Sequence, residues 1–324
     1  MALLKKVFLA ALIFACASLT WAADLSPEQL GRTPVIDGGR IKPADTLARS
    51  ALMRFGGRAQ VSDGATKMSA SEWFSKIIQA DSSVDSLRIF KIDHPELKTL
   101  VGHPDQKFFS YSELLNVLPT LAQAASTLNP ESKDPYDRQL GDLTKNLLYY
   151  YELKGALTPG GLFSQPLPTL TPAQHARVNY EFTYNQIKPL FWAQVFYTLA
   201  FVSLLLTRLW PRNSRMAGLL FISLALILHI VGICSRMYIQ ERPPVTNLYS
   251  SAIFIGAIAV IGCAFIERGL KNNLGLLLGA LIGFVTLQIS DKLAESGDTL
   301  EMMRAVLDSN FWLSTHVIMV TIGY

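Results

Sequence analysis

The chain changes from amphipathic to almost uniformly apolar at about residue 189. Beyond this point long apolar runs follow one another, separated by short polar segments. Most of them approach the roughly 20 residues that an α-helix needs to cross the hydrocarbon core of a bilayer. The pattern predicts a mainly α, polytopic helical membrane protein. Complete spans are expected at about 189–209, 217–235, 246–266 and 273–290, and an incomplete fifth span at 310–324.

Residues 24–187 show a different pattern, in which apolar positions recur at helical spacing and short turns interrupt them. Segments such as 43–55 and 69–80 place their large apolar side chains on one face after a Ser, Asp or Thr start signal. The segment 86–92, SLRIFKI, is the only good strand candidate. A Pro- and Gly-rich stretch near 158–174 is typical of a linker. We expect a small, mostly helical domain up to residue 187 and a membrane domain over 188–324.

The first 23 residues have the features of a secretory signal peptide. Lys5 and Lys6 precede an apolar core, and small residues end the segment, so cleavage is expected after Ala22 or Ala23. An uncleaved anchor helix is the alternative. In both cases the domain at 24–187 is expected to be extracytoplasmic.

Positive charge near the apolar runs gives the same orientation. If residues 24–187 are outside, the first span runs inward, and two short loops become cytoplasmic. These loops are dense in Arg and Lys, as the positive-inside rule requires. The loop after the first span carries Arg208, Arg212 and Arg215, and the loop after the third span carries Arg268 and Lys271. We expect a multi-pass protein of the inner (cytoplasmic) membrane with a periplasmic N-terminal domain.

Composition excludes several classes of function. The net charge of +4 is small and scattered, and no basic run is interleaved with aromatic residues, so a nucleic-acid partner is not expected. The sequence contains neither CxxC nor CxxCH, which excludes a thioredoxin-like site and a c-type cytochrome. His94, His103 and His175 lack metal-ligand spacing, so solvated histidines are favoured over a metal site.

A stiff polar loop and the last apolar segment hold the candidate site. The loop is Ser235–Ser251, SRMYIQERPPVTNLYSS. In the expected topology it lies outside, with His229 in the outer half of the second span and His316 at the mouth of the fifth. Neutral imidazole is a good axial ligand for haem iron. An ionisable residue inside a span is a functional candidate by default.

Side chains near the two histidines could complete a ligand pocket. Arg236 and Arg242 could form paired hydrogen bonds with carboxylates, and Trp312 and Tyr249 could line a flat aromatic ligand. Structural roles compete with this interpretation. For His229, a hydrogen bond to a neighbouring helix is the favoured reading. The aromatic residues could lie at the bilayer interface in any membrane protein, and the arginines could anchor lipid headgroups.

At these positions the chain resembles the CcsA/ResC family of cytochrome c biogenesis proteins. The family has an external P-x-S/T-N-x-Y loop before a span, matched here by Pro244, Thr246, Asn247 and Tyr249. Its L-x-S-x-W-L-x-x-H-V span entry resembles LDSNFWLSTHV, which has one extra residue between serine and tryptophan. The segment IDGGRIKPADTLAR resembles the leader domain of larger bacterial members. The second motif is matched by Leu307, Ser309, Phe311, Trp312, Leu313, His316 and Val317.

The resemblance implies a role in cytochrome c assembly. Family members work with a ResB/CcsB-type membrane partner, or are fused to one. They carry haem b across the membrane and present it for covalent attachment to apocytochrome c. The resemblance makes His316 an external axial ligand of the haem iron. Whether this chain is itself an enzyme stays open, although the family belongs to a haem–apocytochrome c ligation machinery.

The sequence departs from the family in its last part. The family's tryptophan-rich external loop and its second external histidine do not occur here. The last apolar run is also shorter than a span needs. We therefore expect the N-terminal part of such a protein, from a fragmentary, frameshifted or split gene.

Two other classes of membrane protein compete with haem handling. A receptor or sensor with an extracytoplasmic ligand-binding domain is the main alternative, and it would need a signalling domain that this sequence does not contain. A transporter would favour paired charges or broken spans near the midplane, which the spans lack. His316 distinguishes these three functions, because only haem ligation requires a histidine at this position.

Overall fold

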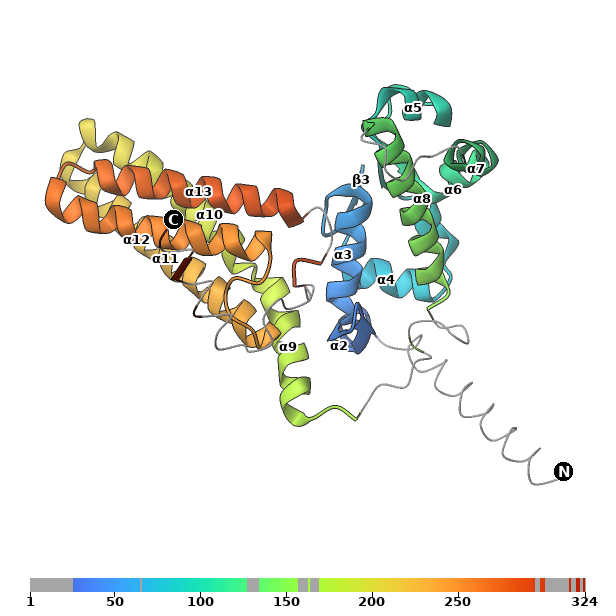
Figure 1. Cartoon of the computed structure of the whole chain (residues 1–324), viewed down its shortest axis with the longest axis horizontal. Helices are drawn as coiled ribbons and strands as arrows, with labels where there is room; N and C mark the ends of the chain where they lie inside the picture. The colour runs from blue at the N-terminus through green and yellow to red at the C-terminus, as the bar shows by residue number, and fades with distance from the viewer. Residues whose placement is uncertain are drawn as a thin grey trace. The chain divides into compact units, whose positions relative to one another are not determined.

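The computed structural model describes residues 26–64, 66–126, 134–156, 163, 169–294, 298–300, 315, 319–320 and 323. It is mainly helical, as the sequence predicts (Figure 1). The chain divides into two compact units between Val178 and Asn179.

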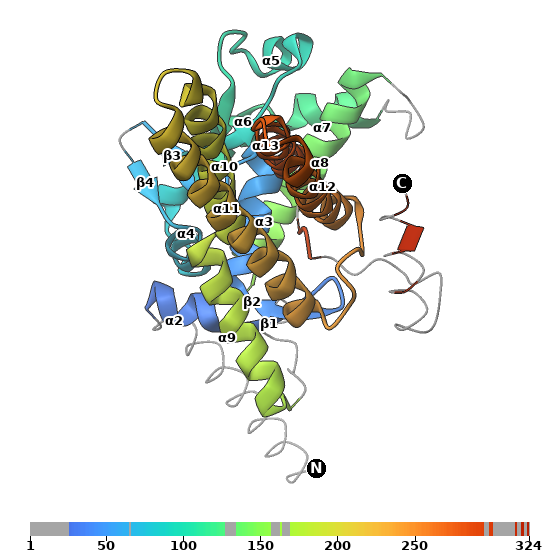
Figure 2. The ribbon, with the colours of Figure 1, turned by 90° about the vertical axis from the view of Figure 1, so that its left-hand side faces the viewer.

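The first unit consists of short helices and small antiparallel hairpins. Its helices are α2 (Pro27–Arg32), α3 (Ala44–Gly56), α4 (Ala70–Ile78), α5 (Pro95–Val101), α6 (Tyr111–Asn116), α7 (Leu118–Ser126) and α8 (Pro135–Lys154), with a 3-10 turn η1 (Ser82–Ser86). Two hairpins can be followed in Figure 2, where β1 (Pro34–Asp37) pairs with β2 (Arg40–Pro43) and β3 (Val61–Asp63) with β4 (Thr66–Met68). A third antiparallel pair joins β5 (Arg88–Lys91) to β6 (Phe108–Ser110), which follows it after helix α5.

Start and stop signals in the sequence account for several element bounds. Ser110 and Glu113 form a capping box at the start of α6, with hydrogen bonds of 3.1 and 2.8 Å. Gly57 ends α3 in the left-handed region with φ 68°, a conformation that costs glycine little. Gly38 and Gly39 also have positive φ, 59° and 76°. Two such residues suit the two-residue turn between β1 and β2.

The strand content of this unit was predicted only in part. The predicted strand at 86–92 is confirmed as β5. The other strands are only three or four residues long, too short for an alternating pattern to be recognised. Part of the predicted linker near 158–174 is helical, because α9 (Pro172–Ile187) begins inside it. Residues 157–162 and 164–168 lie outside the described residues.

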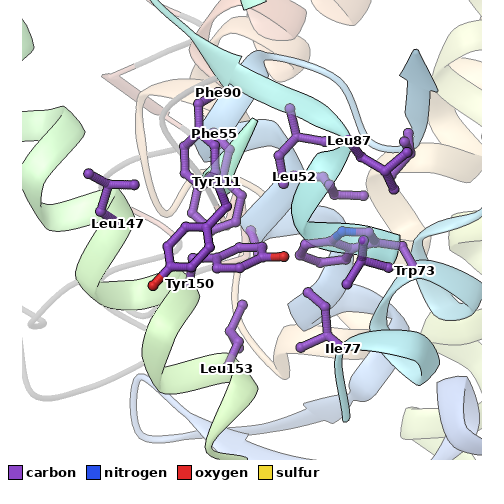
Figure 3. Packing of buried hydrophobic residues seen from close by; sticks show 14 of the residues in the cluster. Leu52, Phe55, Trp73, Ile77, Leu87, Phe90, Tyr111, Leu147, Tyr150 and Leu153 are labelled. Atoms are coloured by element: carbon purple, nitrogen blue, oxygen red, sulfur yellow. The ribbon is translucent and has the colours of Figure 1, made fainter. Parts of the chain in front are cut away.

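Aromatic side chains from several elements form the core of the first unit (Figure 3). Phe55 of α3 packs on Phe90 of β5, with ring centroids 4.9 Å apart, and Tyr150 of α8 packs on Tyr111 of α6 at 4.4 Å. The buried Tyr150 donates its hydroxyl proton to the carboxylate of Asp85 at 2.9 Å. Burial, and then this carboxylate, raise the pKa of Tyr150, so the hydroxyl stays protonated at neutral pH.

Glu113 is expected to make the stability of β5 and α6 depend on pH. Burial alone raises its pKa, but the backbone N–H of Ser110 and the Arg88 guanidinium lower it by more. The stabilisation, about 0.5–1 kcal/mol for such a pair, is therefore complete above pH 4.5, the ordinary Glu value, and is lost as pH falls through the folded-state pKa. Amide hydrogen exchange across β5 and α6 should lose this pH dependence in Glu113→Gln. In the exposed control Glu96→Gln it should persist, and equal profiles in both variants would contradict the assignment.

The second unit is a bundle of long apolar helices. The end of α9 is followed by α10 (Pro189–Leu205), η3 (Leu206–Arg208), α11 (Pro211–Gln240), α12 (Leu248–Leu270) and α13 (Leu274–Ala294). Lys188, with φ 51°, interrupts the helix between α9 and α10, at the point where the composition shift predicts the start of the membrane domain. Helix α10 packs against α11 and α13, and α13 packs along α12.

Among the described residues, four helical stretches are long and apolar enough to cross a bilayer. They are Pro172–Leu205, Arg212–Gln240, Leu248–Leu270 and Leu274–Ala294. Large apolar side chains remain exposed on them, among them Phe191, Leu220, Ile227, Phe265 and Leu278. So much apolar surface is unfavourable in water and suits lipid. The four helices therefore indicate a membrane-embedded protein.

The predicted spans correspond to these helices with shifted ends. The spans predicted at 217–235 and 246–266 fall on α11 and α12, and that at 273–290 falls on α13. The span predicted at 189–209 falls on α10 and continues into η3. The incomplete fifth span at 310–324 lies almost wholly outside the described residues.

Glycines allow the bundle helices to approach closely. A Cβ atom added at Gly283 of α13 would lie 2.8 Å from the ring of Tyr197 on α10. One added at Gly279 would lie 3.1 Å from Cβ of Cys263 on α12. Cys263 thus packs at the α12–α13 contact.

Gly283→Ala is expected to lower the thermal unfolding midpoint of the detergent-solubilised protein. The added methyl group would push the Tyr197 ring away from α13, and overpacking of this kind costs about 1–3 kcal/mol. Gly262→Ala is the matched control, because nothing lies within 4 Å of a Cβ at that position. Equal midpoints for the two glycine variants would show that this contact is not tight.

Candidate functional site

His229 is a fully buried polar residue of the helix bundle, with 0% of its surface exposed. Its Nε2 lies 3.0 Å from the backbone oxygen of Ile253 on α12. Its Nδ1 lies 3.2 Å from the hydroxyl of Tyr197 on α10. Because a carbonyl only accepts, Nε2 carries the proton, and Nδ1 accepts from the tyrosine. The imidazole therefore joins three helices.

This geometry bears directly on His229 as a candidate haem ligand. Both ring nitrogens already make hydrogen bonds, so an iron atom could bind only after one of these bonds breaks. The Tyr197 ring stands edge-on to the imidazole, and a Cβ at Gly256 would lie 3.4 Å from its Cε1. The described surroundings of His229 are those of a helix-linking residue, the role that the sequence favoured.

Arg236 lies about two turns further along α11 and is also buried, with 5% of its surface exposed. Its Nη1 donates to the hydroxyl of Thr299 at 3.1 Å, and its Nη2 donates to the backbone oxygen of the same residue. The guanidinium lies over the ring of Tyr249, 4.4 Å from its centroid, a cation–π arrangement. The Tyr184 side chain of α9 hydrogen-bonds with Arg236 as well.

The loop between α11 and α12 is tied to the same place. Glu241, with φ 51°, ends α11. Asn247 then caps α12 by accepting the Ser250 N–H at 2.8 Å. The Asn247 side chain also donates to the backbone oxygen of Thr299 at 2.9 Å. Asn247, the asparagine of the P-x-T-N-x-Y motif, therefore caps α12 and holds Thr299, the hydrogen-bond partner of Arg236.

Two buried polar atoms beside this loop have no hydrogen-bond partner in the described part of the chain. They are Nε of Arg236 and Oγ1 of Thr246. Among the described residues, moreover, no carboxylate lies within ion-pair distance of the Arg236 guanidinium. A buried, uncompensated cation is costly. We name Arg236, Thr246, Asn247, Tyr249 and Thr299 the arginine site; chemically, it suits an anion with oxygen atoms.

The predicted site residues are thus only partly brought together. Arg236 and Tyr249 are in direct contact. Arg242 is half-buried in the adjoining loop and makes no hydrogen bond or ion pair with the residues that the structure describes. Trp312 and His316 lie outside the described residues.

Several residues in or near the arginine site were not predicted from the sequence. Thr299 follows α13 in a polar segment without a recognisable motif, and its contact with Arg236 joins positions 63 residues apart. Tyr184 could have been recognised, because Tyr180, Glu181 and Tyr184 follow helical spacing on α9. The Tyr180 hydroxyl lies 2.9 Å from that of Ser235. Helix α9 therefore provides one wall near the arginine site.

A second polar contact links α10 and α13. Gln194 donates to the Asp291 carboxylate at 2.7 Å, and Gln288 donates to Gln194 at 3.4 Å. Among the described residues, no group of three His, Cys, Asp or Glu side chains could hold a metal ion. The hydrogen bonds of Gln194 to Asp291 and Gln288 thus join α10 to α13.

In comparisons with known proteins, no family model matches the chain and no curated protein matches it. Its function is therefore inferred from the arginine site and from the two sequence motifs.

Proposed function

We propose that the protein handles haem at the outer face of the inner membrane and presents it for attachment to apocytochrome c. The observation that carries this proposal is the buried guanidinium of Arg236, which has no carboxylate partner among the described residues. It lies over the ring of Tyr249, one of the residues that match the CcsA/ResC motif. A ResB/CcsB-type protein would be the membrane partner.

Haem b, as the transported substrate, has chemistry that fits this site. Its propionates are carboxylates, and a guanidinium can bind a carboxylate through two parallel hydrogen bonds. Arg236 Nε and the Thr246 hydroxyl are unpartnered polar atoms that could receive propionate oxygens. The ring of Tyr249 offers an aromatic surface beside them. His316 would hold the iron, as the family resemblance implies, while His229 is the weaker candidate.

The proposed orientation follows from charge. The arginine site lies at the α11–α12 loop, whereas Arg215, Arg268 and Lys271 lie at the other ends of those helices. With the basic ends in the cytoplasm, the arginine site opens at the periplasmic face and the N-terminal domain is periplasmic. This is the face at which apocytochrome c would receive haem.

A visible absorption spectrum of the purified protein tests the proposal. The full chain in detergent, titrated with haemin, should develop a Soret band distinct from that of free haemin in the same detergent, and His316→Ala should weaken or abolish this difference. His175→Ala is the matched control, because His175 is an exposed histidine of α9. A folded protein without a Soret band, or equal bands in all three proteins, would contradict haem ligation by His316. Absence of any band would favour a receptor with an extracytoplasmic ligand-binding domain.

A further inference from the structure

A cavity of about 460 Å³ lies between α11, α12 and α13, at the helix ends opposite the arginine site. Apolar side chains line most of it, namely Leu219, Ile222, Leu226, Val260, Ala264 and Leu276. Ile222, Val260 and Leu276 are buried and form its floor, while Leu219 is exposed at its rim. We call this cavity the basal groove. Its size is that of a small-molecule site, and its lining suits a hydrocarbon chain.

Three cations stand at one end of the basal groove. They are Arg215 of α11, Arg268 of α12 and Lys271, the residue that follows α12. All three are exposed, and none forms an ion pair with another described residue. Arg268 lies over the Phe265 ring at 5.2 Å, which leaves its hydrogen-bond donors available. Like charges gathered in this way repel one another unless an anion lies between them.

The acidic residue of the groove does not neutralise these cations by pairing. Glu267 is buried, and its carboxylate accepts the backbone N–H groups of Asn273 and Gly275 at 2.8 and 3.1 Å. The carboxylate is thereby directed toward the start of α13, where the helix dipole favours negative charge. The groove therefore combines an apolar floor with an unpaired cationic rim.

We propose that the basal groove binds an anionic phospholipid, with the phosphate at Arg215, Arg268 and Lys271 and one acyl chain along the apolar floor. Basic pockets between membrane helices bind acidic headgroups in this manner. Charge complementarity selects an anionic lipid over a zwitterionic one, and the apolar floor selects a lipid over free phosphate. The proposal requires the four helices to cross the bilayer. It is independent of haem handling, because no residue of the arginine site takes part.

Native mass spectrometry of the full chain in detergent can test this lipid site. Phosphatidylglycerol is added to delipidated protein, with phosphatidylcholine as the zwitterionic comparison. Wild type should retain phosphatidylglycerol in preference to phosphatidylcholine. Each of Arg215→Gln and Arg268→Gln should weaken that retention about fivefold, the effect of removing one cation near an acidic headgroup. Ala264→Trp, which fills the groove without changing charge, should abolish retention.

Arg212→Gln is the matched control. Arg212 is an exposed arginine in the same turn of α11 as Arg215 but does not line the groove. Unchanged retention in this variant supports a defined site, whereas equal losses in all three arginine variants would show only general surface attraction and overturn the proposal. Equal retention of both lipids, or displacement of phosphatidylglycerol by inorganic phosphate at equal concentration, would also overturn it. Circular dichroism of each variant confirms that its helices are intact.

Discussion

Arg236→Gln is expected to weaken haem binding by the detergent-solubilised chain by about thirtyfold or more. Removing one partner of a buried, hydrogen-bonded charge pair costs about 2–5 kcal/mol, and each 1.4 kcal/mol is a factor of about ten. Arg236 is suited to such a pair because it is buried over Tyr249 and has no carboxylate partner among the described residues. Arg236→Lys should give an intermediate loss, since an ammonium keeps the charge without the planar fork. Haemin titration followed by Soret absorbance measures both effects.

A chemical control separates propionate binding from a general loss of structure. Haemin dimethyl ester lacks free carboxylates, so wild type should bind it about as weakly as Arg236→Gln binds haemin. The same substitution should hardly change the affinity for the ester. Arg212→Gln removes an equal charge far from the arginine site and should bind haemin normally. If Arg236→Gln weakens both ligands to the same extent, Arg236 acts through folding and not through the propionates.

The sequence predicted the membrane unit well because its signal is local. A run of about 20 apolar residues forms a spanning helix largely regardless of its neighbours. Asn247 and Pro211 likewise act within one turn of the helices that they begin. The hairpins of the first unit were mostly missed, because strands of three or four residues depend on contacts with the rest of the fold and show little pattern of their own.

The candidate site was predictable in its residues but not in its contacts. The polar segment Ser235–Ser251 drew attention to Arg236 and Tyr249, and the structure places them against each other. The partners of Arg236 come from Thr299 and Tyr184, positions that only helix packing brings near. The same holds for His229, whose hydrogen bonds reach 32 and 24 residues along the chain. A sequence alone suggests that a buried histidine needs partners, but not which ones.

His229→Leu is expected to destabilise the helix bundle. Leucine removes the hydrogen bonds to Tyr197 and Ile253, and a buried polar group left unpaired costs about 1–3 kcal/mol. His229→Gln should cost less, because an amide can both donate and accept at this position. The thermal unfolding midpoint of the haem-free protein in detergent measures these differences. Equal midpoints for wild type and His229→Leu would show that the two hydrogen bonds contribute little to the bundle.

The same two variants decide between the two roles of His229. If the imidazole only links helices, His229→Gln should bind haemin with an unchanged Soret maximum, because the iron is held elsewhere. If it is an axial ligand, both variants should shift or lose the Soret band, since neither leucine nor an amide replaces imidazole on iron. In His229→Gln the unfolding midpoint thus reports the helix-linking role, whereas the Soret band reports ligation of the iron. A recovered midpoint with a lost Soret band would assign His229 to the iron despite the hydrogen bonds that it makes in the haem-free bundle.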